Sequence, residues 1–151
     1  KSIKLVHHEL QYGLPYNDNS APNIFSSHFF EHIFKNEAEA LTKECYRVLK
    51  PGGIIRICVP SLLNEIEAIE NAIKAYKANG SDNIQKYVTS NIVGFNSTYS
   101  NHRYIYDWEK LSSMFKASGF KDIKQYEFQQ GEIPDVKVLD TRDGLFIEAT
   151  K

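Results

Sequence analysis

The stretch SSHFFEHIFKNEAEALTKECYRVLKPGGIIRICVP, residues 26–60, decides the fold of this chain because it contains most of one strand, helix and strand unit. A short apolar strand beginning near Asn23 leads into it. Apolar residues at helical spacing follow between Lys35 and Lys50, and a Pro-Gly-Gly turn precedes the apolar run 54–59. Two strands joined by a crossover helix form a parallel pair. The stretch therefore predicts an α/β protein.

Length and composition bound the remaining possibilities. The chain has 151 residues, 42% of them hydrophobic and 25% charged, which suits one domain with its own core. A net charge of -1 provides no electrostatic footprint for nucleic acid or for an anionic membrane, so we expect neither partner. Cys45 and Cys58 occupy apolar positions without a disulfide framework, which indicates a reducing compartment and predicts a cytoplasmic location.

The rest of the chain predicts a mixture of helices and strands. A helix after Ser61 has apolar residues at helical spacing, and a second helix is capped by Asp107 and ends at Gly119. The turn-rich segment 81–101 suggests a lid-like insertion. We expect strands at residues 3–6, 122–128 and 145–149, the last two as an antiparallel pair.

Several segments together resemble a class I S-adenosylmethionine-dependent methyltransferase, and they cover almost the whole chain. The segments are LPYNDNS (14–20), residues 24–33 with the pair Glu31-His32, YRVLKPGG (46–53), DWEKL (107–111), ASGF (117–120) and residues 145–151. The chain looks closest to small bacterial predicted methyltransferases that end in an Asp-Thr-Arg segment and an apolar strand. The resemblance implies a Rossmann-like sheet, mostly parallel with an antiparallel C-terminal strand pair, and S-adenosylmethionine as cofactor.

The sequence departs from this family at its beginning. No glycine-rich loop of the G-x-G-x-x-G kind occurs in the chain, and the first two strands of the family sheet have no counterpart. The chain begins with Lys1 and its only methionine is Met114, so we expect a single methyltransferase-like domain over residues 1–151 that is truncated at its N-terminus. Alone, this chain is expected to be inactive and to bind S-adenosylmethionine weakly or not at all.

The missing strands would leave an open edge beside the strand that begins near Asn23, and open edges invite pairing. Three outcomes are possible: an upstream segment completes the sheet, the strand at residues 3–6 moves in beside it, or a second copy covers the edge in a homodimer.

By resemblance, five residues are candidates for cofactor binding. Glu9 occupies the place of the acidic residue that contacts the adenine amino group, and Leu10 lies beside the adenine ring. Ser26, Ser27 and His28 end a parallel strand, where ligands bind in open α/β sheets. The alternative for Glu9 is a solvated loop carboxylate.

The catalytic residue is unknown, with three candidates. Methyl transfer from a sulfonium mainly requires orientation of the substrates and sometimes a proton acceptor. His28 could accept a proton or simply pack locally, and His102 and Arg103 could line an acceptor pocket or form a surface turn. His28 and His32 have a metal-ligand spacing, but no cysteine or third histidine is near in sequence, so the sequence predicts no metal site.

Two classes of function remain open. The first is a methyltransferase that acts on a small-molecule or saccharide acceptor. The second is a non-catalytic methyltransferase-like module, used for binding or dimerisation, that has lost the cofactor loop. A nicotinamide-dependent oxidoreductase is disfavoured because it also needs the glycine loop.

Overall fold

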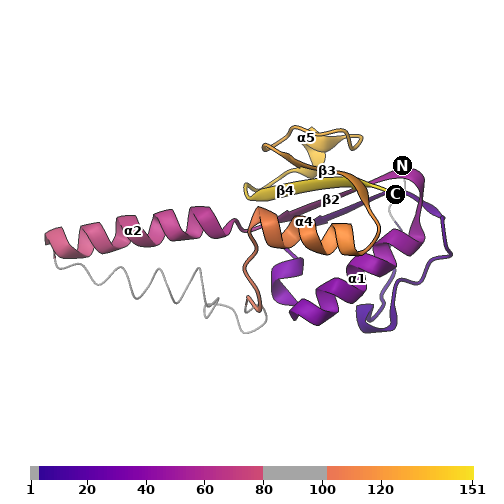
Figure 1. The fold of residues 1–151 in the computed structure, drawn as a ribbon, viewed down its shortest axis with the longest axis horizontal. Coiled ribbons are helices and arrows are strands. Elements are labelled where there is room, and N and C mark those ends of the chain that lie inside the picture. The colour runs from indigo at the N-terminus through magenta and orange to yellow at the C-terminus, as the bar shows by residue number, and fades with distance from the viewer. Residues whose placement is uncertain (1–3, 80–101) are drawn as a thin grey trace.

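The computed structural model describes residues 4–79 and 102–151 and shows a mixed sheet covered on both faces (Figure 1). The strand order is β1-β2-β4-β3. The strands are β1 (Ala21–Ser27), β2 (Leu49–Val59), β3 (Lys121–Tyr126) and β4 (Leu145–Thr150). The helices are α1 (Lys35–Val48), α2 (Leu62–Asn79), α4 (Trp108–Ala117) and α5 (Val136–Leu139), with short 3-10 turns η1 (Leu10–Tyr12) and η2 (Phe30–His32).

The strand, helix and strand unit predicted from residues 26–60 is present. β1 and β2 are parallel, with Ile24 opposite Ile55, and α1 is the crossover between them. The register shifts between Ala21 and Asn23 of β1, because their partners on β2 are Leu49 and Ile54, with Pro51-Gly52-Gly53 between them. The expected α/β arrangement, with a helix joining two parallel strands, is confirmed.

The C-terminal part of the sheet is antiparallel, as predicted. β4 pairs with β2 and with β3, both antiparallel, so the described sheet has one parallel pair and two antiparallel pairs. Asp107 caps α4 by accepting a hydrogen bond of 2.7 Å from the Lys110 N–H. Gly119, with φ at 98°, follows this helix in a conformation that glycine adopts readily.

The strand expected at residues 3–6 is not formed over residues 4–6, the part that the structure describes. Residues 4–9 have no regular secondary structure, and the Leu5 side chain is 92% exposed. The outcome in which this segment moves in beside β1 is therefore wrong. The physical reason is that a short, charge-interrupted run gains little by burial and has no ladder partner among the described residues. The lid-like insertion expected at 81–101 lies outside the described residues.

The hydrophobic core lies between the sheet and the two helices α1 and α4, which cover the same face in Figure 1. α1 contributes Ala38, Leu41 and Cys45, and α4 contributes Leu111 and Phe115, all buried. In contrast, α2 extends away from the sheet (Figure 1), and several large apolar side chains along it are exposed. None of the described helices is both long and apolar enough to cross a membrane.

The opposite face of the sheet, below α5, carries a buried ion network. Arg56 on β2 is completely buried and donates to Asp140 at 2.9 and 2.6 Å and to Glu148 on β4 at 2.8 Å. The Gln129 N–H donates to Asp140, and the Glu132 N–H donates to Glu148. The Asp-Thr-Arg segment near the C-terminus thus contributes Asp140 to the interior.

Candidate functional site

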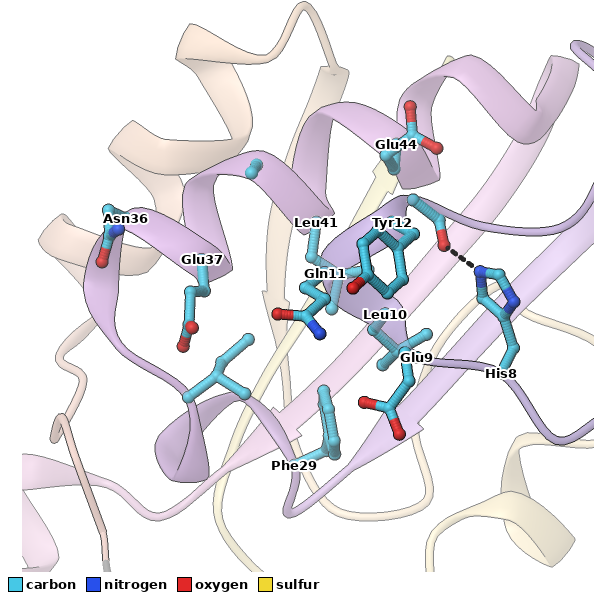
Figure 2. A pocket seen from close by; sticks show the side chains of 13 residues that line it. His8, Glu9, Leu10, Gln11, Tyr12, Phe29, Asn36, Glu37, Leu41 and Glu44 are labelled. Carbon is cyan, nitrogen blue, oxygen red and sulfur yellow. Dashed lines mark hydrogen bonds between the residues drawn. The ribbon is translucent and has the colours of Figure 1, made fainter.

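A cleft of about 810 Å³ lies between η1 and α1, and Figure 2 shows the side chains around it. Glu9 and Leu10, both predicted to contact the cofactor, line it. Phe29, which follows the carboxyl end of β1, and Leu41 of α1 line it as well. The cleft therefore combines apolar surface with a carboxylate.

Arg47 fixes the loop that leads into β1 against α1. Its guanidinium donates to Glu44 at 2.9 and 2.8 Å, to Asp18 at 2.7 Å and to the backbone carbonyl of Tyr16 at 2.9 Å. Glu44 also accepts from the Leu14 N–H at 2.9 Å. The hydrogen bonds from Arg47 and then from Leu14 lower the pKa of Glu44 to about 2. These contacts explain why LPYNDNS and YRVLKPGG occur together: Arg47 of the second segment binds the first.

Three of the predicted cofactor residues lie at the end of β1, outside the lining of the cleft. Ser26 and Ser27 pair with Ile57 and Cys58 of β2 and are half-buried. His28 has φ at 49°, an uncommon backbone conformation for a residue with a side chain, and its N–H donates to the Cys58 carbonyl at 2.9 Å. The structure therefore separates Glu9 and Leu10, in the cleft, from these three residues beside it.

Next to the strand end, polar side chains gather around Glu31. Its carboxylate is buried, with Oε1 at 3.4 Å from His28 Nδ1 and 3.6 Å from His32 Nε2. The rings of His32 and His102 are 5.0 Å apart between centroids. Two of the predicted catalytic candidates, His28 and His102, are thus brought together. We call Glu31, His32, His102 and His28 the histidine cluster.

The environment changes the proton affinities within the cluster. Hydrogen bonding to Cys58 and then to Glu31 raises the pKa of His28 to about 10. Burial lowers the pKa of His102. Nearby, burial raises the pKa of the Tyr106 hydroxyl to about 12.

Arg103, the third catalytic candidate, packs away from the other two. Its guanidinium lies 5.0 Å from the centroid of the Phe34 ring, a cation–π contact. The backbone N–H of Arg103 donates to the backbone carbonyl of Glu31 at 2.6 Å. The sequence predicted no role for Glu31 and no metal bound to His32, although the pair Glu31-His32 is part of the family resemblance.

The described residues fit the adenosine end of S-adenosylmethionine but not its methionine end. The cleft offers Glu9 as an acceptor for an amino group and Leu10 and Phe29 as apolar walls, which suits a purine. No glycine-rich loop follows a strand in residues 4–79 or 102–151, so backbone N–H groups for the methionine end are not found there. No reaction step is therefore assigned through the cofactor.

Comparison with known proteins finds similarity to methyltransferases. Residues 1–57 match the sequence model of a family described as methyltransferase domain. No curated protein matches the chain.

Three solved structures have similar folds. A methyltransferase from Thermotoga maritima, described as a possible histamine N-methyltransferase, is 18% identical, with a TM-score of 0.55 over 93% of this chain and 61% of its own. A methyltransferase from Archaeoglobus fulgidus is 17% identical, with a TM-score of 0.54 over 90% and 62%. The S-adenosylmethionine-dependent methyltransferase SibL is 14% identical, with a TM-score of 0.57 over 96% and 35%. This chain thus spans about three fifths of the first two and a third of SibL.

Proposed function

Because this chain has the fold of class I S-adenosylmethionine-dependent methyltransferases, we propose that it is part of such an enzyme and that its cleft takes the adenosine end of the cofactor. The observation that carries the proposal is the meeting of η1 and the carboxyl end of β1 at one cleft, where Glu9 and Leu10 lie with Phe29. The carboxyl ends of parallel strands are where open α/β sheets bind ligands.

The cleft residues have distinct tasks in this proposal. The Glu9 carboxylate accepts a hydrogen bond from the adenine amino group, which is a donor. Leu10 and Phe29 pack against the faces of the purine and exclude water from it. When bound, S-adenosylmethionine would supply a methyl group that is already activated by its sulfonium. The acceptor in this proposal is a small molecule or a saccharide.

The location in this proposal is the cytoplasm. Cys45 and Cys58 are both free thiols and both buried, and thiols persist in reducing compartments. The near-neutral net charge of -1 favours a small acceptor over nucleic acid.

A second function is favoured by one specific observation. Among the described residues β1 has a strand partner on one side only, which is the edge that a second copy of the chain could cover. A non-catalytic module that dimerises through β1 would need neither a cofactor nor a glycine loop.

Titration of the isotopically labelled chain with S-adenosylmethionine and, separately, with adenosine tests the proposal. We expect both ligands to bind weakly and to shift the NMR signals of Leu10 and Phe29, because only the adenosine end has its contacts. Leu10→Arg should abolish these shifts. Leu63→Arg is the matched control, since Leu63 is 70% exposed on α2.

The outcomes separate the two functions. Absence of shifts in the cleft, together with a mass that doubles with concentration in light scattering, would favour the dimerising module. Micromolar affinity for S-adenosylmethionine would instead contradict the expectation that the methionine end lacks contacts in this chain.

A further inference from the structure

The buried carboxylate of Glu31 is the least satisfied polar group in the described part of the chain. The residue is 1% exposed, and its carboxylate has only long contacts among the described residues, at 3.4 Å to His28 Nδ1 and 3.6 Å to His32 Nε2, with no hydrogen bond of good geometry to either oxygen. Nδ1 of the neighbouring His32 is also buried without a partner there. A buried carboxylate without a good hydrogen bond is costly, and such groups in folded proteins call for a specific explanation, of which a bound ion is one.

The donor atoms of the cluster converge. One ligand atom each from Glu31, His32 and His102 lie within 4.8 Å of one another. Nitrogen and oxygen ligands bind ions such as Zn²⁺ at about 2.0–2.2 Å, so ligand atoms around one ion are roughly 3 to 4 Å apart. The observed spacing needs only small side-chain adjustments to surround an ion.

The backbone holds these donors in place before any ion arrives. The N–H groups of Arg103 and Tyr104 both donate to the Glu31 carbonyl, at 2.6 and 3.2 Å. These two bonds bring His102 next to His32 although the two are far apart in sequence. The third histidine that the sequence lacked nearby is therefore supplied by the fold.

His28 offers a fourth donor next to Glu31, with Nδ1 at 3.4 Å from Glu31 Oε1. Its Nε2 lies 3.3 Å from the carbonyl oxygen of Asp143. A metal ion would displace the proton of Nδ1, and an N–H at Nε2 would continue to donate to that carbonyl. Metal-binding imidazoles commonly donate their other N–H to a carbonyl in this way.

An ion pair between protonated His28 and Glu31 explains the observed distances less well than a bound metal ion does. Charge-assisted hydrogen bonds from a nitrogen to a carboxylate oxygen are about 2.7–2.9 Å long, whereas the separations here are 3.4 Å to His28 and 3.6 Å to His32. The pair would also leave the second Glu31 oxygen and His32 Nδ1 without partners.

We propose that Glu31, His32 and His102 bind a divalent first-row transition metal ion such as Zn²⁺, with His28 within reach as a fourth ligand. Imidazole nitrogens together with one carboxylate favour Zn²⁺ and its neighbours over Mg²⁺, which prefers oxygen ligands. None of the four residues lines the cleft, so this site does not depend on the proposed cofactor. The sequence-based prediction of no metal site is revised by this proposal.

Metal titration of the full chain, after treatment with EDTA, tests the site. We expect one equivalent of Zn²⁺ to bind in calorimetry, and Co²⁺ to give the visible absorption of a coordinated ion. Glu31→Gln and His102→Ala should each weaken binding by about tenfold or more. His7→Ala is the matched control, because it removes an exposed imidazole outside the cluster.

Thermal unfolding separates the loss of a ligand from the loss of the fold. Without metal, Glu31→Gln should be at least as stable as the parent chain, since a neutral amide costs less to bury than a carboxylate that has only long contacts to two imidazoles. Zn²⁺ should raise the Tm of the parent chain and leave that of Glu31→Gln unchanged.

Two results would overturn the proposal. One is the absence of saturable Zn²⁺ or Co²⁺ binding, with Glu31→Gln less stable than the parent chain, as an ion pair with His28 would require. The other is metal binding that persists in Glu31→Gln and His102→Ala but is lost in His7→Ala.

Discussion

Replacing Arg56 with methionine tests the ion network buried below α5. Methionine retains a long side chain but removes the only cation that pairs with Asp140 and Glu148 in the described structure. Breaking a buried ion pair costs about 3–5 kcal/mol because the remaining charge is buried without compensation. Here two carboxylates remain, but each keeps a backbone N–H donor, from Gln129 and from Glu132. We therefore expect Arg56→Met to lower the free energy of unfolding by about 4 kcal/mol.

Such a loss is a large part of the 5–15 kcal/mol that typically separates folded from unfolded domains. Urea unfolding can be followed through Trp108, the only tryptophan, which packs against the core. We expect a lower midpoint with an unchanged slope. The urea midpoint of Arg56→Lys should lie between those of the parent chain and Arg56→Met, because lysine keeps the charge and loses the planar guanidinium.

The matched control is Lys124→Met, which removes a cationic side chain from a pair with Glu132 at 2.6 Å. Both partners of that pair are more than half exposed, at 53% and 55%. Solvent screens such pairs, so the control should leave the urea midpoint nearly unchanged. A loss below about 1 kcal/mol in Arg56→Met would refute the reasoning, because it would mean that the network is hydrated or not formed.

Two further predictions concern the stability of the fold, one through the charge of Glu44 and one through the close backbone approach at Gly53. The pKa of Glu44 is lowered from 4.5 to about 2 by Arg47 and the Leu14 N–H, so its charge stabilises the fold above pH 4.5 and this advantage is lost as the pH falls toward 2. Acid titrations of stability for the parent chain and Glu44→Gln should therefore differ at pH 6 and converge near pH 2, and a constant difference would contradict this. Gly53→Ala places a Cβ 2.6 Å from the Pro22 carbonyl oxygen and should cost about 1–3 kcal/mol by urea unfolding. An unchanged midpoint would mean that the strands can separate there without penalty.

The sequence predicts the elements whose signals are local. Helical spacing predicts α1, the apolar run 54–59 predicts the second half of β2, and an aspartate cap predicts α4, whereas the Pro-Gly-Gly expected as a turn lies within β2. The failure at residues 3–6 has a different origin, since a strand exists only where another strand accepts its hydrogen bonds. Apolar residues alone do not supply that partner.

The candidate sites depend on contacts between distant segments, and the sequence shows these poorly. Glu9 and Leu10 could be proposed from the resemblance alone, and the structure places them in a cleft. The position of His102 beside His32 depends on backbone hydrogen bonds to Glu31, which no spacing pattern reveals. Arg56 did give a signal, because a charge inside an apolar strand requires a buried partner.

The position of β2 at the centre of the sheet has a kinetic consequence. One edge of β2 pairs with β1, which is joined to it by a single crossover helix, whereas Ile57 on the other edge pairs with Ile147, 90 residues further along the chain (147 - 57). Closing a loop of that length costs about 4 kcal/mol of chain entropy before any contact compensates for it. The nearby pair can therefore assemble while the second edge of β2 is still unpaired, and in that interval the apolar strand is a template for any other extended chain.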